Sequence, residues 1–205
     1  MNAALDHLDQ FSIFGRSSVA FFLILALDWA FSAVHAYDEW RGEEAPLWRV
    51  FGAIVGLLVP NRVGFLFFTL GLTLALWGAG LAGICGCLPF VGQIPMAATV
   101  GALGVIIGAR ISDTLVSHWA LYALGYRPNP GLKSTPLYVI EAVFIALTFW
   151  KGLALAPCAA WTGVALGAVV FSLVLPGLRA VRTIRPLWAR APWIRWQPLP
   201  EWTKE

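Results

Sequence analysis

Histidine and acidic side chains occur together near the end of the first long apolar stretch of this chain. His35, Asp38 and Glu39 lie there, and helical spacing places other polar residues on the same face. The residues that share this face are Asp28, Ser32, His35 and Glu39. In lipid such a face must point inward, because ionisable groups need a partner, water or a metal. This face is therefore the first candidate site.

Imidazole and carboxylate groups favour two kinds of chemistry. They are ligands of zinc, iron and manganese, and a histidine beside an acid is a competent acid–base pair. The residues for which we expect a catalytic or metal-binding role are His35, Glu39, His118 and Glu141. The residues expected around them, as orienting or proton-relay groups, are Asp28, Asp38, Arg110 and Asp113. The predicted cofactor is a divalent transition metal, and Arg110 should pair with Asp113 or Asp28, or anchor an anionic substrate.

The composition predicts the elements that position these groups. The chain has 205 residues, of which 59% are hydrophobic and 12% charged, and several apolar runs approach the roughly 20 residues that cross a bilayer. We expect an all-α, polytopic transmembrane bundle of about five spans, with an interfacial helix near residues 47–59. The predicted spans are Ser18 to Tyr37, the stretch after Pro60 to Cys85, Ala97 to Leu124, Pro136 to Lys151 and Ala159 to Leu175. The predicted domains are a transmembrane part, 1–178, and a basic tail, 179–205.

Basic residues in the loops predict the orientation of this bundle. They gather after the first, third and fifth spans, and the N-terminal residues carry acids where a signal peptide would be basic. We expect an integral protein of the bacterial inner (plasma) membrane, with its N-terminus outside and its C-terminus in the cytoplasm. Counting spans in this orientation brings His35, Glu39, His118 and Glu141 to one depth near the cytoplasmic leaflet.

The C-terminal tail predicts binding partners, and the three cysteines are not expected to be catalytic. Arginine and tryptophan alternate in residues 179–205, which suits the headgroup layer. The expected partners are the lipid bilayer, anionic lipid at this tail and other membrane subunits, whereas nucleic acid is not expected. Cys85, Cys87 and Cys158 are predicted at the outer face, where a disulfide, a soft-metal site or buried thiols are all conceivable. We expect no catalytic role for them.

Two blocks of sequence resemble the HXXEE-domain family of membrane proteins. The first is His35-Ala36-Tyr37-Asp38-Glu39, in which Asp38 replaces a glutamate and shortens its reach by one methylene. The second is His118 followed by the turn Tyr126-Arg127-Pro128-Asn129-Pro130-Gly131 and then Thr135. The resemblance covers roughly residues 20–150. It implies a membrane enzyme with a His/acid site, and it names no substrate.

Three functions remain open from the sequence. The first is a membrane-embedded enzyme with a metal or acid–base site that acts on a lipophilic substrate near the cytoplasmic leaflet. The second is a non-enzymatic membrane subunit whose polar residues pair helices within a larger complex. The third is a haem carrier with two axial histidines.

Overall fold

The computed structural model describes residues 18–42 and 96–180, with isolated positions between them (50, 63, 64, 67, 70, 71 and 73–75). All the elements in these stretches are helices, as the sequence predicts. They are α2 (Ser18–Gly42), α5 (Met96–Ser112), the π-helix η1 (Asp113–Ala120), α6 (Leu121–Ala123), α7 (Thr135–Thr148), α8 (Trp150–Leu155), α9 (Pro157–Ser172) and α10 (Val174–Arg179). The predicted interfacial helix (except residue 50), Cys85, Cys87 and the tail beyond residue 180 lie outside the described residues.

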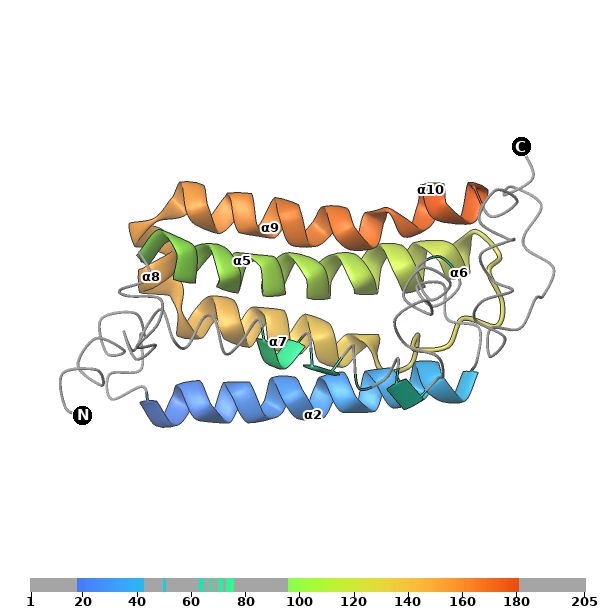
Figure 1. Ribbon diagram of the computed structural model, residues 1–205, viewed down its shortest axis with the longest axis horizontal. Helices are drawn as coiled ribbons and strands as arrows, with labels where there is room; N and C mark the ends of the chain where they lie inside the picture. Colours follow the sequence, from blue (N-terminus) through green and yellow to red (C-terminus); the bar gives the residue numbers. More distant parts are fainter. Residues whose placement is uncertain are drawn as a thin grey trace.

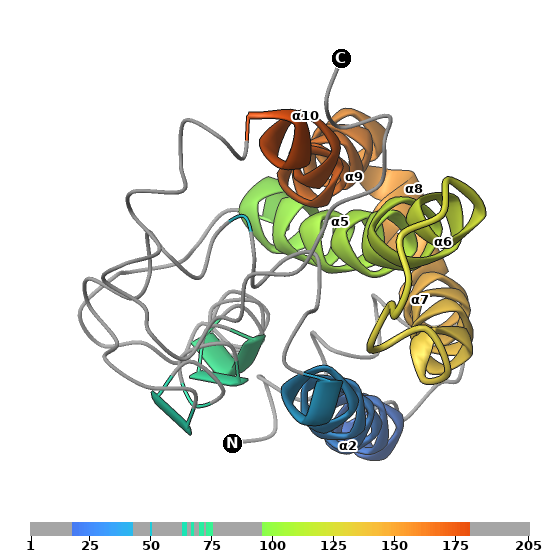
Figure 2. The ribbon, with the colours of Figure 1, turned by 90° about the vertical axis from the view of Figure 1, so that its right-hand side faces the viewer.

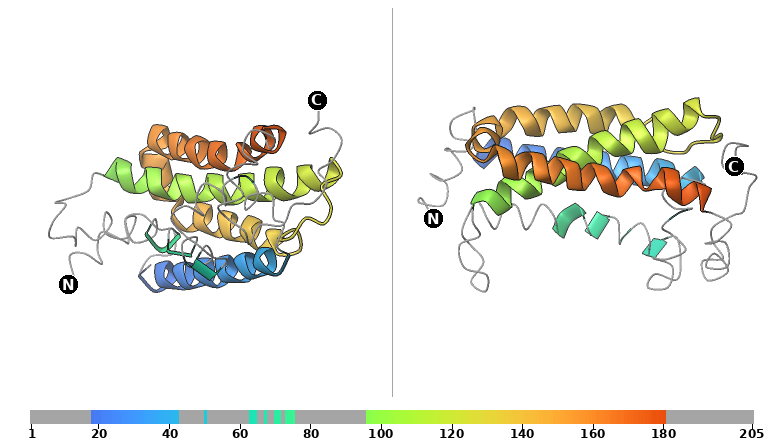
Figure 3. Two further views of the ribbon diagram at one scale, coloured as in Figure 1. Left: turned by 45° about the vertical axis from the view of Figure 1, so that its right-hand side comes forward. Right: turned by 90° about the horizontal axis from the view of Figure 1, so that it is seen from above.

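The long helices lie side by side in the order α9, α5, α7 and α2 (Figures 1 and 2). η1 and α6 continue α5, α8 connects α7 to α9, and α10 continues α9 (Figure 3). α2, α5 and α9 run in one direction and α7 runs in the other (Figure 1), which is the alternation predicted for the first, third, fourth and fifth spans. The ends of α2, α6 and α10 therefore meet the start of α7 at one end of the bundle.

Glycines let α5 and α9 approach closely. A Cβ atom added at Gly104 or Gly108 would meet the backbone of α9, and one added at Gly163 or Gly167 would meet the backbone of α5. Small residues at such spacing allow helices to pack backbone against backbone. Gly104 and Gly108 are therefore packing residues between α5 and α9.

Fewer possible spans than predicted are found among the residues that the structure describes. Within the described part of the chain, two helical stretches are long and apolar enough to cross a membrane, Val100–Ala123 and Pro157–Arg179. The predicted fourth span is a helix of 14 residues, Thr135–Thr148, because the backbone leaves helical geometry at Phe149 before α8 begins. The predicted second span lies largely outside the described residues. An all-helical fold is therefore confirmed, whereas five spans are not.

Candidate functional site

One face of α2 supplies the first half of the site. Its polar members are all buried: Asp28, Ser32, His35 and Glu39 have exposed fractions of 0%, 3%, 3% and 4%. On the same helix Trp29, Val34 and Tyr37 are exposed. The helix thus turns its polar stripe inward and its apolar residues outward, as the spacing predicts.

The π-helix η1 supplies the second half. It spans Asp113–Ala120 and carries Asp113 and His118, both buried. Five residues apart on an α-helix, two side chains diverge by about 140°. In a π-helix the hydrogen bonds run from residue i to i+5, so these two side chains come to the same side. This backbone change places Asp113 beside His118.

The two halves meet in a compact cluster. Asp113 lies 3.2 Å from Nε2 of His35 and 3.8 Å from Nε2 of His118. Glu39 lies 3.9 Å and 3.7 Å from the same two nitrogens. The imidazole rings are 4.9 Å apart and nearly perpendicular. One ligand atom each from His35, Asp113 and His118 lies within 4.8 Å of the other two, a spacing that could hold a metal ion.

Asn129 sets the tautomer of His118. Its amide nitrogen donates to the carbonyl oxygens of Ser117 and His118, at 3.2 and 3.0 Å. Its amide oxygen therefore faces Nδ1 of His118, 2.7 Å away. Because an amide oxygen can only accept, Nδ1 carries a proton, and in the neutral ring the lone pair is on Nε2, which faces the cluster.

Ser134 does the same for His35. Its hydroxyl lies 2.9 Å from the Gly131 carbonyl oxygen and 3.1 Å from the Asp38 carboxylate, both of which are acceptors. Having one proton to give, the hydroxyl must accept from Nδ1 of His35, 2.9 Å away. In the neutral His35 ring Nε2 then carries the lone pair, whereas in the protonated ring Nε2 donates to Asp113, 3.2 Å away. The Ser134 side chain makes no cap hydrogen bond to α7.

Gly131 covers the cluster from the turn before α7. It has a φ of +88°, and a Cβ atom there would lie 2.5 Å from Cε1 of His118 and 2.9 Å from Cε1 of His35. Glycine is the residue that adopts this backbone conformation without penalty and leaves room for both rings. The turn from Asn129 to Ser134 thus holds both imidazoles from one side.

Arg110 forms a separate buried cluster. Its guanidinium donates to Asp28 at 2.7 Å and to Glu141 at 3.2 Å. It also donates to Ser32 and lies 4.1 Å above the Tyr138 ring. Tyr138 connects this cluster to the histidines, because its ring centre is 4.4 Å from that of His35. Of the two partners predicted for Arg110, the structure selects Asp28.

The structure thus divides the predicted site residues into two groups. His35, Glu39 and His118 lie together as expected, and Asp113 takes the inner position that we expected for Glu141. Glu141 is bound to Arg110. Asp38 is half-buried and reaches the site through Ser134. Asn129 and Ser134 were missed as orienting groups, because hydrogen bonds across a turn leave no periodic pattern in the sequence.

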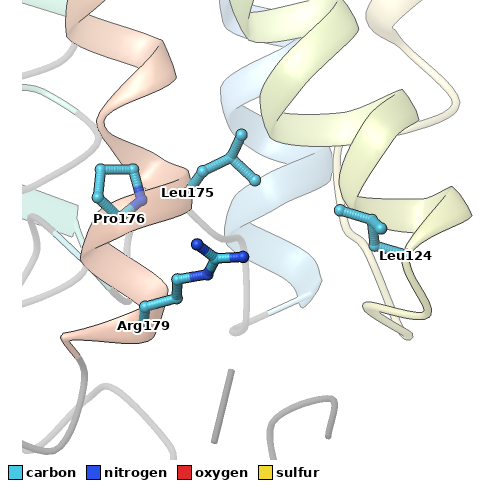
Figure 4. Close-up of a pocket in the computed structure, with 4 residues that line it drawn as sticks. All are labelled: Leu124, Leu175, Pro176 and Arg179. Atoms are coloured by element: carbon cyan, nitrogen blue, oxygen red, sulfur yellow. The ribbon is translucent and has the colours of Figure 1, made fainter. Parts of the chain in front are cut away.

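Two other features lie apart from this cluster. A cleft of about 260 Å³ at the same end of the bundle is lined by Leu124, Leu175, Pro176 and Arg179 (Figure 4). Its walls are apolar, with one guanidinium beside them. Cys158 is an exposed free thiol near the start of α9, at the opposite end of the bundle (Figure 1).

No protein-family model, curated protein or solved structure matches this chain. The resemblance to the HXXEE-domain family therefore has no support beyond the two sequence blocks.

Proposed function

We propose that the chain is a membrane-embedded enzyme that uses its two histidines and nearby carboxylates on a lipophilic substrate. The observation that carries this proposal is a set of buried polar atoms without hydrogen-bond partners: Nε2 of His35, Nε2 of His118 and Oδ1 of Asp113. Polar groups that only join helices are expected to be satisfied by one another. Asp28 and Glu141 also have one oxygen each without such a partner, but they are already paired with Arg110. In the histidine cluster the outer nitrogens are satisfied, and the inner atoms converge on one point. Such an arrangement suits acid–base or metal chemistry.

A membrane setting is supported by the distribution of polarity. The buried residues include charged and polar side chains on α2, α5, η1 and α7, whereas the exposed ones include Phe144, Trp150, Trp161 and Val170. Only 17% of the apolar stretch within Pro157–Arg179 is buried, so this helix is not the core of a soluble domain. A polar interior beneath an apolar surface is the pattern required in lipid. We propose about five spans, the remaining ones including α2 and the segment around residues 63–75.

The proposed orientation places the site near the cytoplasmic leaflet. Lys151 in α8 and Arg179 in α10 lie at opposite ends of the bundle (Figure 1). A single cysteine is introduced at either position, in a chain whose own three cysteines are replaced. An impermeant maleimide should then reach the two positions from opposite sides of the membrane. Labelling of position 151 in intact cells, and of position 179 only after lysis, is expected. The reverse result would place the site at the outer leaflet.

The proposed activity is tested by comparing lipid extracts. Cells that express the wild-type chain should contain a lipid-soluble product that is absent with His118→Ala and with His35→Ala. His7→Ala is the matched control, because His7 is the third histidine of the chain and lies outside the described residues. Each variant must appear in the membrane at the wild-type level. The enzyme proposal would be overturned if the lipid profile did not depend on His35 or His118 while the variants still supported the cellular role of the chain. The subunit hypothesis would then remain.

The haem hypothesis is not favoured by the distances. An axial pair of histidines must leave a porphyrin plane between the two nitrogens. In this chain the carboxylates of Asp113 and Glu39 lie within 3.9 Å of both Nε2 atoms. A visible spectrum of the purified protein without a Soret band is therefore expected.

A further inference from the structure

We propose that His35, Asp113 and His118 bind one divalent transition metal of the zinc class, with Glu39 beside an open fourth position. This inference rests on the proposed function and names its cofactor. The donors are two imidazole nitrogens and one carboxylate, a set that occurs in catalytic zinc sites. Such sites keep three protein ligands and leave a position for water or substrate.

The spacing of the donor atoms fits a tetrahedral ion. Zinc ligands at about 2.0–2.2 Å from the metal lie about 3.4 Å from one another in a tetrahedron. Oδ2 of Asp113 lies 3.2 Å from Nε2 of His35, and Oδ1 of Asp113 lies 3.8 Å from Nε2 of His118. Small side-chain movements would therefore complete the coordination.

The protonation of the ligands also fits a cation. Asn129 and Ser134 hold a proton on Nδ1 of each ring, so both Nε2 atoms offer lone pairs when the rings are neutral, which is the form of histidine that binds a metal. Without a metal, Nε2 of His35 must either take up a proton to pair with Asp113 at 3.2 Å or leave its lone pair facing the carboxylate, which is costly in a buried site. Arg110 is bound to Asp28 and Glu141 instead. A metal ion at the centre would satisfy the nitrogens and the carboxylate together.

Glu39 is placed to serve the open position. Its carboxylate lies 3.7 and 3.9 Å from the two imidazole nitrogens, yet the group whose ligand atoms all lie within 4.8 Å consists of His35, Asp113 and His118. Glu39 therefore stands next to the metal ligands, where a carboxylate can accept a proton from a bound water. We assign the metal-binding role of the site to the other three residues.

The outer hydrogen bonds should tune this site. Partners of the second ring nitrogen fix the orientation and tautomer of a metal-binding histidine, and their loss typically reduces affinity 10–100-fold. Asn129→Ala should therefore weaken metal binding by about this factor without removing a ligand. A residue that only supports the turn would leave the affinity unchanged.

The test is metal binding by the purified full-length protein in nanodiscs. Elemental analysis of the isolated protein should show one transition metal per chain. After chelation and dialysis, Co²⁺ titration should give the intense visible bands of a tetrahedral site. Binding should be lost in His35→Ala, His118→Ala and Asp113→Asn, and retained in Glu39→Gln and in the control His7→Ala. Size-exclusion profiles and thermal melting of the chelated variants establish that they are folded.

The outcomes separate this inference from the proposed function. Folded wild-type protein that contains no metal and binds no Co²⁺ would overturn the metal site. If the lipid product still formed and still depended on His118, the enzyme proposal would stand with acid–base chemistry alone. Loss of binding in Glu39→Gln equal to that in Asp113→Asn would overturn the assignment of three ligands and an open position.

Discussion

Replacing Gly131 by alanine tests whether the turn before α7 fixes the geometry of the site. Gly131 and Gly125 have nearly the same backbone conformation, with φ values of +88° and +89°. A side chain at either position should cost about 1–2 kcal/mol, because L-residues are strained in the left-handed region. Their surroundings differ: no atom lies within 4 Å of a Cβ at Gly125. Gly125→Ala is thus a matched control for the backbone penalty.

The steric effect at Gly131 follows from the distances. Its Cβ would lie 2.5 Å from Cε1 of His118 and 2.9 Å from Cε1 of His35, and carbon atoms prefer separations of about 3.5–4.0 Å. The His118 ring would have to move by about 1 Å and the His35 ring by somewhat less. Overpacking of this kind costs about 1–3 kcal/mol beyond the backbone penalty. A 1 Å displacement of a reacting group can lower a rate about 100-fold.

We therefore expect Gly131→Ala to lower formation of the lipid product about 100-fold and to weaken Co²⁺ binding. Gly125→Ala should retain both properties while losing stability from the backbone alone. Denaturant unfolding in detergent measures the stability difference between the two variants, and the lipid and Co²⁺ assays measure the effect on the site. Equal function in the two alanine variants would refute the argument that the turn positions the histidines.

Three further predictions concern the rest of the bundle. Arg110→Met should destabilise the protein by about 3–5 kcal/mol, since it leaves buried carboxylates uncompensated. Adding Asp28→Asn should recover part of this loss. Additive effects of the two substitutions on the free energy of unfolding would show that Arg110 and Asp28 do not interact. Gly108→Ala should destabilise by about 1–3 kcal/mol through contact with the α9 backbone. Gly101→Ala should not destabilise the protein, because the added Cβ would meet its nearest neighbour at 3.7 Å. Equal unfolding curves for Gly108→Ala and Gly101→Ala would contradict the close packing. Cys158→Ser should leave product formation unchanged, because this exposed thiol lies at the far end of the bundle; lost activity in folded protein would show otherwise.

The sequence predicted the parts of the site that follow from the geometry of a single helix. Asp28, Ser32, His35 and Glu39 are three or four residues apart, and all four are buried on one face of α2. The ends of the third and fourth predicted spans were also close to those observed, because Pro128, Pro130 and Pro136 interrupt the helical pattern there. Covalent geometry fixes the helical period. These predictions therefore needed no knowledge of neighbouring helices.

Tertiary structure decided which polar groups meet. The π-helical hydrogen bonds of η1 bring Asp113 beside His118, whereas the α-helical period separates them. Because α7 packs between α2 and α5, Glu141 pairs with Arg110. The turn before α7 places Asn129 and Ser134 within hydrogen-bond distance of Nδ1 of His118 and His35. The relative depth and rotation of packed helices depend on contacts between residues far apart in sequence. The periodicity of one segment does not contain that information.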